Sequence, residues 1–463
     1  MSLISDSSVI AVFKFVKNMN GLLLNFVNTS KLYKIVNGVD KAINNYILKN
    51  SPIVRHISTT PFPANVPNAG LASRLLDGHK TNQYVAERSE GQKVPLAENV
   101  FEVYGLNECP SLTSELTKEE ALQYLRAMKR IRRMEQLAQA LYLDRKIRGF
   151  CHLYIGEEAC AVGLKPSMGP KDTLITSYRC HGWALLMGQT VEMILGELLG
   201  RINGSARGKG GSMHMYGTNF FGGNGIVGGH VPLGTGVALA HKYRNNGAIS
   251  WTSFGDGAAD QGQTFESYNM AKLWNLPIVY TIENNQYSMG TATKRHSANT
   301  RYFTRGDLIP GIKVDGMDLL AVRQAGKFAA AYVRAGKGPI ILQLDTYRFR
   351  GHSMSDPGTS YRSKSEVDKI MKSKDCIKNF AEKVIAQQLI SDEDLKAIQK
   401  EVKKEMKEVQ DKCLKVKEPS IEETHHDVYQ EYKAKVRMPP MEGLREHKNV
   451  SHLVKKNKQC VKQ

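Results

Sequence analysis

The stretch from residue 254 to residue 287 constrains the fold more than any other part of the chain. An apolar run over residues 248–254 leads into the glycine-rich turn F-G-D-G-A-A-D-Q-G, and residues 264–274 have the composition of a helix. A second apolar, β-branched run over residues 278–282 is followed by E-N-N-Q-Y. Strand, glycine turn, helix and strand in this order predict a βαβ unit with two parallel strands.

Both strands of this unit end in residues that carry oxygen ligands. Asp256 follows the first strand and Asn285 follows the second, and ligands bind beyond the carboxyl ends of the strands in open parallel sheets. Mg²⁺ prefers oxygen ligands and keeps positions for phosphate and water, so these two side chains and the main-chain carbonyl of Tyr287 form a suitable set. Gly255 and Gly257 allow the backbone to approach a phosphate closely. We therefore predict a site for a Mg²⁺-bound diphosphate.

The same motif carries a resemblance to a known family. G-D-G followed by N-N resembles the thiamine diphosphate-binding motif, and the flanking sequence resembles the alpha subunit of the pyruvate dehydrogenase first component over about residues 100–419. The resemblance is specific because several separate blocks occur in the same order. These blocks are R-G-F-C-H-L at 148–153, S-Y-R-C-H-G at 177–182, G-K-G-G-S-M-H-M at 208–215, G-G-N-G-I-V-G at 222–228 and R-G-H-S-M-S-D-P-G at 350–358.

The resemblance implies an α/β fold of the thiamine diphosphate-binding type, with a mostly parallel sheet flanked by helices and a helical C-terminal region. A capping box from Thr117 to Glu120 predicts the start of a long helix, and Ser391 predicts the start of another. The expected organisation is a mitochondrial transit peptide (1–60), an extended arm (61–110), an α/β domain that binds thiamine diphosphate and Mg²⁺ (111–362), a helical part (363–430) and a basic tail (431–463).

The resemblance also assigns roles to individual residues. It implies that His152 and His352 are catalytic, and an imidazole with a pKa near neutral would suit His352 as a proton donor or acceptor. The metal ligands it implies are those of the motif: Asp256, Asn285 and Tyr287. The residues that it implies bind the cofactor are Tyr178, Arg179, Gly217, Gly225, Val227, Asp256, Gly257, Ala258, Asn285, Tyr287 and His352.

The implied reaction is the oxidative decarboxylation of pyruvate, with transfer of the acetyl group to lipoyl groups of a dihydrolipoyl acetyltransferase core. Thiamine diphosphate acts as the electron acceptor in such reactions, and its activation needs a buried Glu beside the aminopyrimidine. We find no Glu placed for this role on an apolar strand, and no second α/β domain. The chain is therefore expected to supply only the diphosphate half of the site, and to need a beta subunit in an α₂β₂ assembly.

Control by phosphorylation is implied for residues 350–362. Ser353 and Ser360 match regulatory serines of the family, which a pyruvate dehydrogenase kinase and phosphatase act on. A phosphate on Ser353 would add about −1.5 to −2 charges close to anionic ligands. The chain has Ala292 where the family can carry a third serine, and Asp260 where Asn is more usual, which adds a negative charge near the metal.

Composition limits the other classes of function. Much of the net charge of +19 is terminal, with seven Lys or Arg and two Asp in residues 1–60, and nine Lys or Arg and three Glu in residues 431–463. No stripe of Arg and aromatic residues indicates nucleic-acid binding. Seven scattered Cys without C-x-x-C spacing favour a reducing compartment. Residues 1–60 are too polar for a membrane span and resemble a transit peptide for the mitochondrial matrix.

Two alternatives remain open from the sequence. The first is the alpha subunit that acts on branched-chain 2-oxo acids, which the H-S-M-S-D-P-G segment disfavours. The second is a regulatory paralogue that assembles with a beta subunit without catalysis. The presence of Asp256, Asn285, His152 and His352 argues against a loss of activity.

Overall fold

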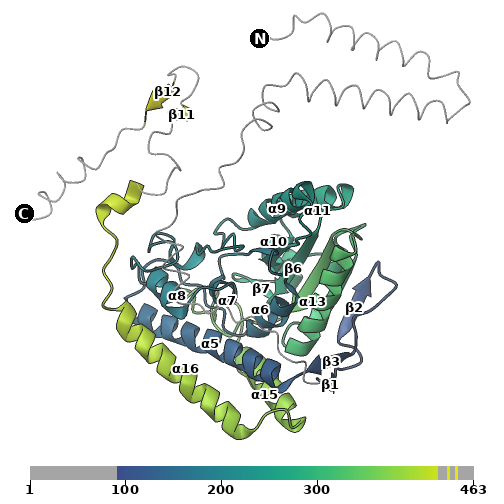
Figure 1. The fold of residues 1–463 in the computed structure, drawn as a ribbon, viewed down its shortest axis with the longest axis horizontal. Coiled ribbons are helices and arrows are strands. Elements are labelled where there is room, and N and C mark those ends of the chain that lie inside the picture. The colour runs from purple at the N-terminus through teal and green to yellow at the C-terminus, as the bar shows by residue number, and fades with distance from the viewer. Residues whose placement is uncertain (1–90, 426–434, 438–443, 447–463) are drawn as a thin grey trace, which may run out of the picture. The chain divides into compact units, whose positions relative to one another are not determined.

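The structure, a computed structural model, describes residues 91–425, 435–437 and 444–446 (Figure 1). The expected transit peptide (1–60), residues 61–90 of the expected arm and most of the expected basic tail lie outside the described residues. In the tail, β11 (Lys435–Arg437) and β12 (Leu444–Glu446) pair as an antiparallel hairpin. All other described elements lie between residues 91 and 425.

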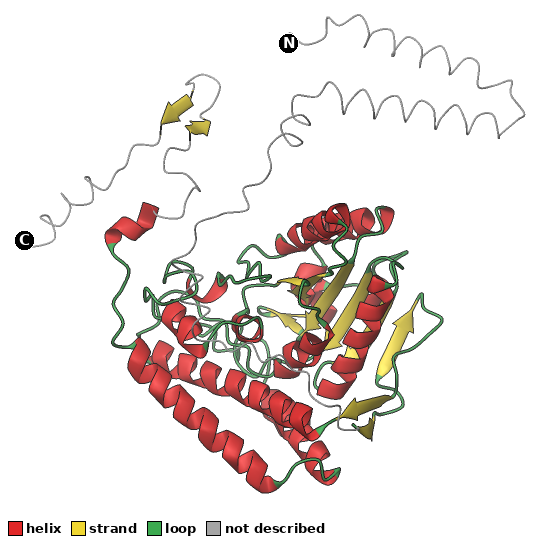
Figure 2. Ribbon diagram, viewed as in Figure 1, coloured by secondary structure: helices red, strands yellow, loops and turns green. Residues whose placement is uncertain are grey.

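A six-stranded sheet lies at the centre, with helices on both of its faces (Figures 1 and 2). The strand order is β2-β9-β10-β6-β5-β4, and β2 alone runs antiparallel to its neighbour in this sheet. The strands are β2 (Phe101–Tyr104), β4 (Thr173–Ile175), β5 (Ser250–Gly255), β6 (Ile278–Asn284), β9 (Gly311–Asp315) and β10 (Ile340–Asp345). Because β5 and β6 are adjacent and parallel, the predicted βαβ unit and the mostly parallel α/β fold are confirmed.

Each face of the sheet has its own hydrophobic core. On β6, Ile278 and Ile282 belong to one core and Val279 to the other, as expected when successive side chains point to opposite faces. Helices α9 (His230–Arg244) and α11 (Gly262–Leu273) cover the first face, and α6 (Glu158–Leu164) and α13 (Leu319–Arg334) cover the second. Burial on both faces explains why these strands are continuous apolar runs in the sequence.

Two of the C-terminal helices, α15 (Cys376–Ala386) and α16 (Asp392–Cys413), pack against the long helix α5 (Lys118–Leu143). The predicted capping box is present, because Thr117 and Glu120 exchange two hydrogen bonds of 3.2 Å, and Ser391 caps the last helix as predicted. Arg130 of α5 forms an ion pair of 2.6 Å with Glu405. The third C-terminal helix is α14 (Lys364–Lys374). The expected helical part therefore shares a core with the α/β domain.

Residues 91–110 of the expected extended arm contain two short strands that pack against the rest of the fold. Strand β1 (Gln92–Pro95) pairs with β3 (Thr113–Leu116), and β2 is the edge strand of the main sheet. Val94 is 1% exposed and belongs to the core. Strands of four residues carry too little periodicity to be recognised among Pro, Gly and Asn.

The remaining elements are short. The α-helices are α7 (His181–Leu186), α8 (Val191–Leu198), α10 (Asp256–Ala259) and α12 (Thr293–His296), and the 3₁₀ helices are η2 (Lys165–Ser167), η3 (Gly211–Met213), η4 (Tyr302–Thr304) and η5 (Ile421–His425). Strands β7 (Tyr287–Ser288) and β8 (Thr291–Ala292) form a small hairpin directly after β6. In the described part of the chain, no helix has both the length and the apolarity needed to cross a membrane.

Candidate cofactor and metal site

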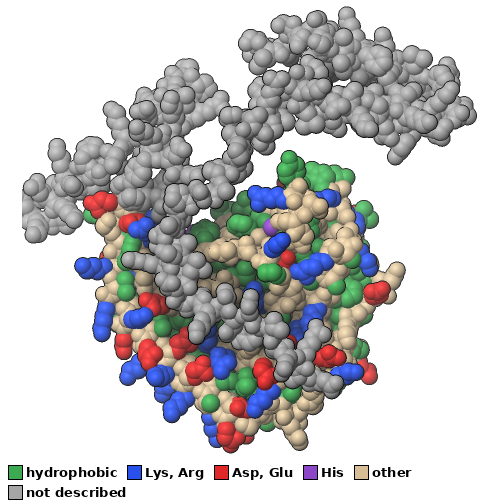
Figure 3. All heavy atoms as spheres, in the orientation of Figure 1, with side chains coloured by type: hydrophobic (Ala, Val, Ile, Leu, Met, Phe, Trp, Pro, Cys, Tyr) green, Lys and Arg blue, Asp and Glu red, His purple; other side chains and the backbone are tan. Residues whose placement is uncertain are grey.

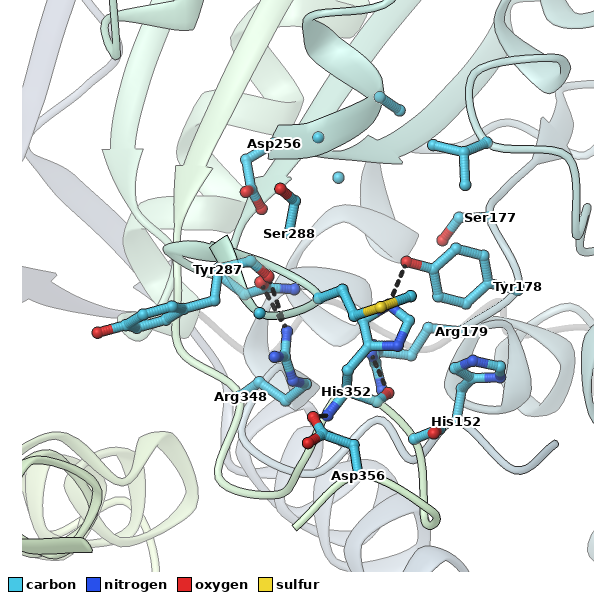
Figure 4. A pocket seen from close by; sticks show the side chains of 18 of the residues that line it. His152, Ser177, Tyr178, Arg179, Asp256, Tyr287, Ser288, Arg348, His352 and Asp356 are labelled. Carbon is cyan, nitrogen blue, oxygen red and sulfur yellow. Dashed lines mark hydrogen bonds between the residues drawn. The ribbon is translucent and has the colours of Figure 1, made fainter. Parts of the chain in front are cut away.

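A cavity of about 860 Å³ lies at the carboxyl ends of β5 and β6 (Figure 4). Nearly all residues predicted for the site line this cavity. They are His152, Tyr178, Arg179, Gly225, Val227, Asp256, Gly257, Ala258, Asn285, Tyr287, His352, Ser353 and Ser360. These residues come from at least five separate segments of the chain, which the fold brings together at one edge of the sheet.

Gly217 is the exception among the predicted residues. Its N–H donates to the carbonyl oxygen of Phe220 at 3.0 Å, and the two residues form an isolated antiparallel bridge. Gly217 does not line the cavity, and its contact with the cofactor stays a prediction. The glycines of this region serve different purposes, and a shared glycine-rich composition does not distinguish a ligand contact from a tight turn.

Asp256 and Asn285 meet at neighbouring strand ends, as predicted. Asp256 begins α10 directly after β5, and Asn285 directly follows β6. Both residues are buried, with Asp256 1% and Asn285 8% exposed. Asn285 Nδ2 donates to Glu157 Oε1 at 2.9 Å, which orients the amide and turns its Oδ1 away from Glu157.

Arg348 joins the other two predicted metal ligands. Its Nη1 donates to Asn285 Oδ1 and to the main-chain oxygen of Tyr287, at 3.0 Å in each case (Figure 4). Gln286, between the two, has a φ of 73°, a left-handed conformation that is uncommon outside glycine and often marks a functional site. The two oxygens therefore converge, and each keeps a second lone pair for a metal ion.

Gly257 is required by the close approach of Ser288. A Cβ on Gly257 would lie 2.6 Å from the Cβ of Ser288, well inside van der Waals contact. The side chains of Ser288 and Asp256 lie close together in Figure 4. A glycine at this position keeps the backbone accessible from the cavity, which suits the predicted phosphate contact.

His152, Tyr178 and His352 form a cluster on the opposite side of the cavity (Figure 4). The ring of His152 lies 4.6 Å from that of Tyr178 and 5.3 Å from that of His352, between centroids. The hydroxyl of Tyr178 and Nε2 of His352 share a hydrogen bond of 2.9 Å. Nδ1 of His152 is buried and has no hydrogen-bond partner among the described residues. A buried, unpartnered nitrogen beside a cavity is a suitable contact for a polar ligand.

Both histidines are neutral at physiological pH. Burial and, next, the positive charge of Arg179 lower the pKa of His152 to about 2. Burial, Arg179 and Arg348 lower the pKa of His352 to about 3. The expectation that His352 titrates near neutral pH is therefore wrong, because the surrounding charges and the loss of solvent both disfavour the imidazolium. A neutral imidazole still offers one donor and one acceptor.

Arg179 lies in the cavity wall and is 4% exposed. Its Nη1 donates to the carbonyl oxygen of Leu153 at 2.6 Å, and its Nη2 donates to the carbonyl oxygen of His352 at 2.8 Å. Its Nε lies 3.9 Å from Glu157 Oε2. Arg179 thus connects the two histidine segments, and its contact with a diphosphate stays a prediction.

Glu283 is a buried carboxyl near the carboxyl end of an apolar strand. It belongs to β6, is 3% exposed and lines the cavity. Its Oε1 accepts hydrogen bonds from Trp183 Nε1 at 3.1 Å and from the hydroxyl of Tyr154. Burial and the neighbouring Glu157 raise the pKa of the Glu283 carboxyl. In the sequence, Glu283 stands inside the E-N-N motif, where it has the pattern of a strand end.

The loop that carries the predicted phosphorylation sites is held by Asp356. Its carboxylate accepts hydrogen bonds from the N–H of His352 at 2.6 Å, the N–H of Gly358 at 2.8 Å and the hydroxyl of Tyr361 at 2.6 Å. Ser353 is 8% exposed, whereas Ser360 is exposed. A phosphate on Ser353 would therefore need space inside the cavity wall.

The cavity fits a Mg²⁺-bound diphosphate. A carboxylate, an amide oxygen and a main-chain oxygen converge at its sheet edge, which is the ligand type that Mg²⁺ prefers. Gly257 provides the backbone access that a phosphate needs, and His152 provides an unpartnered polar atom.

Sequence reasoning missed several residues that shape the site. Arg348 could have been considered from its place four residues before His352, just outside the block at 350–358. Ser288, Glu157 and Asp356 carry no signal of their own, because a single polar residue in a loop is usually a solvated one. Their roles follow from contacts across long sequence separations.

The fold and the cavity together define a class: an α/β protein that can hold an anionic cofactor and a metal at the carboxyl edge of a parallel sheet. A family model described as dehydrogenase E1 component matches residues 126–422. The chain belongs to this family, whose members depend on thiamine diphosphate.

Similar proteins come from nematodes and mammals. The chain is 52% identical over 346 residues to the probable pyruvate dehydrogenase E1 component subunit alpha, mitochondrial, of Caenorhabditis elegans, covering 75% of this chain and 85% of that protein. It is 53% identical over 329 residues to the type I subunit alpha of Ascaris suum, with 71% and 83% covered. It is 48% identical over 361 residues to the somatic form of Homo sapiens, with 77% and 93% covered.

Proposed function

We propose that this chain is the alpha subunit of a pyruvate dehydrogenase that catalyses the oxidative decarboxylation of pyruvate. The observation that carries this proposal is the convergence of Asp256, Asn285 and the carbonyl of Tyr287 on one cavity, opposite His152 and His352. The names of the similar proteins support pyruvate as the substrate, since each is named a pyruvate dehydrogenase subunit alpha.

In this proposal, the sheet edge holds Mg²⁺ and the diphosphate. Asp256, Asn285 and the main-chain oxygen of Tyr287 bind the metal, while the main chain at Gly257 and Ala258 contacts the diphosphate. The backbone at Gly225 and Val227, on the cavity wall, contacts the thiamine rings. Thiamine diphosphate supplies the electron acceptor for decarboxylation when it is bound.

The histidine cluster binds the substrate beside the cofactor. Tyr178 orients His352 through its hydrogen bond to Nε2, and the free Nδ1 of His152 is available for an oxygen of pyruvate. Since both rings are neutral, they act first as hydrogen-bonding groups. Burial of the cluster excludes water and strengthens these hydrogen bonds.

We further propose that the chain acts with a beta subunit in an α₂β₂ assembly. The similar proteins are named subunit alpha. Hydrophobic side chains gather at the upper edge of the coloured part of Figure 3, where Figure 1 places α9 and α11. The exposed apolar residues of these helices and the turn after α11 are Leu233, Leu239, Tyr243, Phe265, Leu273 and Trp274. Apolar surface of this extent favours a protein partner.

The remaining partners follow from the same proposal. The acetyl group passes to lipoyl groups of a dihydrolipoyl acetyltransferase core, which feeds acetyl-CoA formation. Location in the mitochondrial matrix is supported by the mitochondrial names of the relatives and by the composition of residues 1–60. A pyruvate dehydrogenase kinase and phosphatase would act on Ser353 and Ser360, which border the cavity.

The test is reconstitution of residues 61–463 with a beta subunit. We expect decarboxylation of pyruvate that requires both thiamine diphosphate and Mg²⁺, and that falls to background in Asp256→Ala. Glu108→Ala, which removes an exposed carboxylate, should behave as the unmodified chain. An assembled complex without turnover would support a regulatory paralogue, and faster turnover of branched-chain 2-oxo acids would assign the other substrate class.

A further inference from the structure

A second group of charged residues lies directly behind the predicted metal ligand Asp256. His296, the last residue of α12, places Nε2 3.3 Å from Asp256 Oδ2 and Nδ1 2.6 Å from Asp260 Oδ2. The side chain of His296 is 16% exposed. One imidazole therefore links two carboxylates, one of which belongs to the candidate metal site.

Asp260 is itself fixed by further contacts. Its Oδ1 accepts a hydrogen bond from Ser297 Oγ at 3.2 Å and forms an ion pair with Arg305. The guanidinium of Arg305 lies 4.9 Å from the ring centroid of Phe265 and 5.5 Å from that of Tyr302. Asp260 is thus held by its ion pair with Arg305, and Arg305 is held by packing against the two rings.

The geometry leaves one oxygen of Asp256 available. Oδ2 is taken by His296, and Oδ1 accepts no hydrogen bond from the residues that the structure describes. Because Asp256, Asn285 and Tyr287 line the same cavity, this second oxygen of Asp256 is available to a metal ion bound there.

We propose that His296 is a positioning residue, which holds the Asp256 carboxylate in the orientation that binds the metal, while Asp260 and Arg305 hold the imidazole in place. The inference rests on the proposed function, since it needs a metal at Asp256. Residues outside the ligand set that orient a ligand commonly change metal affinity by about 10–100-fold when they are removed.

This role predicts a separation between metal affinity and turnover. His296 does not line the cavity, so its loss acts through Asp256, whose side chain becomes free to rotate and binds the metal more weakly. Once the metal is saturating, Asp256 is ordered by the metal itself. We therefore expect His296→Ala to raise the dissociation constant of the metal about tenfold or more, with kcat at saturating metal changed by less than about twofold.

The experiment uses the complex with a beta subunit and thiamine diphosphate, and measures Mn²⁺ binding by electron paramagnetic resonance. His296→Gln keeps one donor and should lose less affinity than His296→Ala. Asp260→Asn, which is nearly isosteric, should weaken binding, and the double variant His296→Ala with Asp260→Asn should be no weaker than His296→Ala alone, because Asp260 acts through His296. Lys294→Ala on the exposed side of α12 is the matched control.

The outcomes distinguish a failure of this inference from a failure of the proposed function. Mn²⁺ affinity of His296→Ala within about twofold of the unmodified complex, or additive losses in the double variant, would overturn the role of His296. If His296→Ala does not assemble, the Mn²⁺ affinities of His296→Gln and Asp260→Asn are compared with that of the unmodified complex by the same criteria. Absence of Mn²⁺ binding by the unmodified complex would overturn the proposed function together with this inference.

Discussion

Single side chains of the site are held by contacts that tolerate little change. Asn285 is oriented by Glu157 at 2.9 Å and by Arg348 at 3.0 Å, so both ends of its amide are engaged. The left-handed backbone at Gln286 turns the chain between two predicted metal ligands. At the residue scale, the orientation of each side chain in the site is fixed by neighbours within van der Waals or hydrogen-bond distance.

Gly257→Ala should lower both stability and cofactor binding through a steric clash with Ser288. The added Cβ would lie 2.6 Å from the Cβ of Ser288, and forced overpacking of this kind costs about 1–3 kcal/mol. We expect a lower melting temperature and weaker binding of thiamine diphosphate, measured by thermal unfolding and by calorimetry.

The matched control for Gly257→Ala is a second substitution. Ser288→Gly removes the Cβ that clashes, so the double variant should regain most of the lost stability and cofactor affinity. If the double variant is as impaired as Gly257→Ala, the contact with Ser288 is not the cause.

At the scale of elements, the loop after β10 controls one wall of the cavity. Asp356 gathers the N–H groups of His352 and Gly358 and the hydroxyl of Tyr361. Arg348, at the start of the same segment, contacts Asn285 and Tyr287. A change that moves this loop therefore also reaches the predicted metal ligands.

Ser353→Glu should affect the loop more than Ser360→Glu. Ser353 is 8% exposed and its Oγ lies 2.9 Å from Ser355 Oγ, so a carboxylate there must be buried beside the site, which is costly for an unpaired charge. Ser360 is exposed. For Ser353→Glu we expect the activity to fall at least about tenfold, which corresponds to about 1.4 kcal/mol. We also expect faster proteolysis within residues 350–362.

Two comparisons, with Ser353→Ala and with Ser360→Glu, test the role of burial at Ser353. Ser353→Ala should stay close to the unmodified enzyme, because alanine introduces no charge. Equal effects of Ser353→Glu and Ser360→Glu would contradict the argument from burial.

At the scale of the whole molecule, helix α5 and the pair α9 and α11 differ in what covers them. Helix α5 is covered by α16, with ion pairs from Arg126 to Glu401 and from Arg130 to Glu405. Helices α9 and α11 present apolar side chains at the surface (Figure 3). This difference supports the proposal that α9 and α11 contact another subunit.

Leu233→Glu should therefore weaken assembly without unfolding the chain. Leu233 on α9 is 56% exposed, so the isolated chain loses little by the change, whereas a buried charge at an interface is unfavourable. We expect at least about tenfold weaker association with a beta subunit, roughly 1.4 kcal/mol, measured by light scattering after gel filtration. Leu143→Glu, at a site 67% exposed on α5, should assemble normally, and equal assembly of both variants would contradict this interface.

Much of the fold and many candidate site residues could be predicted from the sequence, because their signals are local. The capping box at Thr117 and the strand ends at Asp256 and Asn285 occupy the predicted positions. Gly217 lies outside the cavity lining and in a tight turn with Phe220, although it shares the glycine-rich composition of the neighbouring segments.

The sequence by itself determined the order of elements, the position of the βαβ unit and the oxygen residues at its strand ends, because periodicity and turn chemistry act over a few residues. Only the tertiary structure decided that Arg348 reaches Asn285, that Glu283 is buried beside the cavity and that His352 stays neutral. These properties depend on distances between remote segments and on the loss of solvent around them, and no local pattern encodes either quantity.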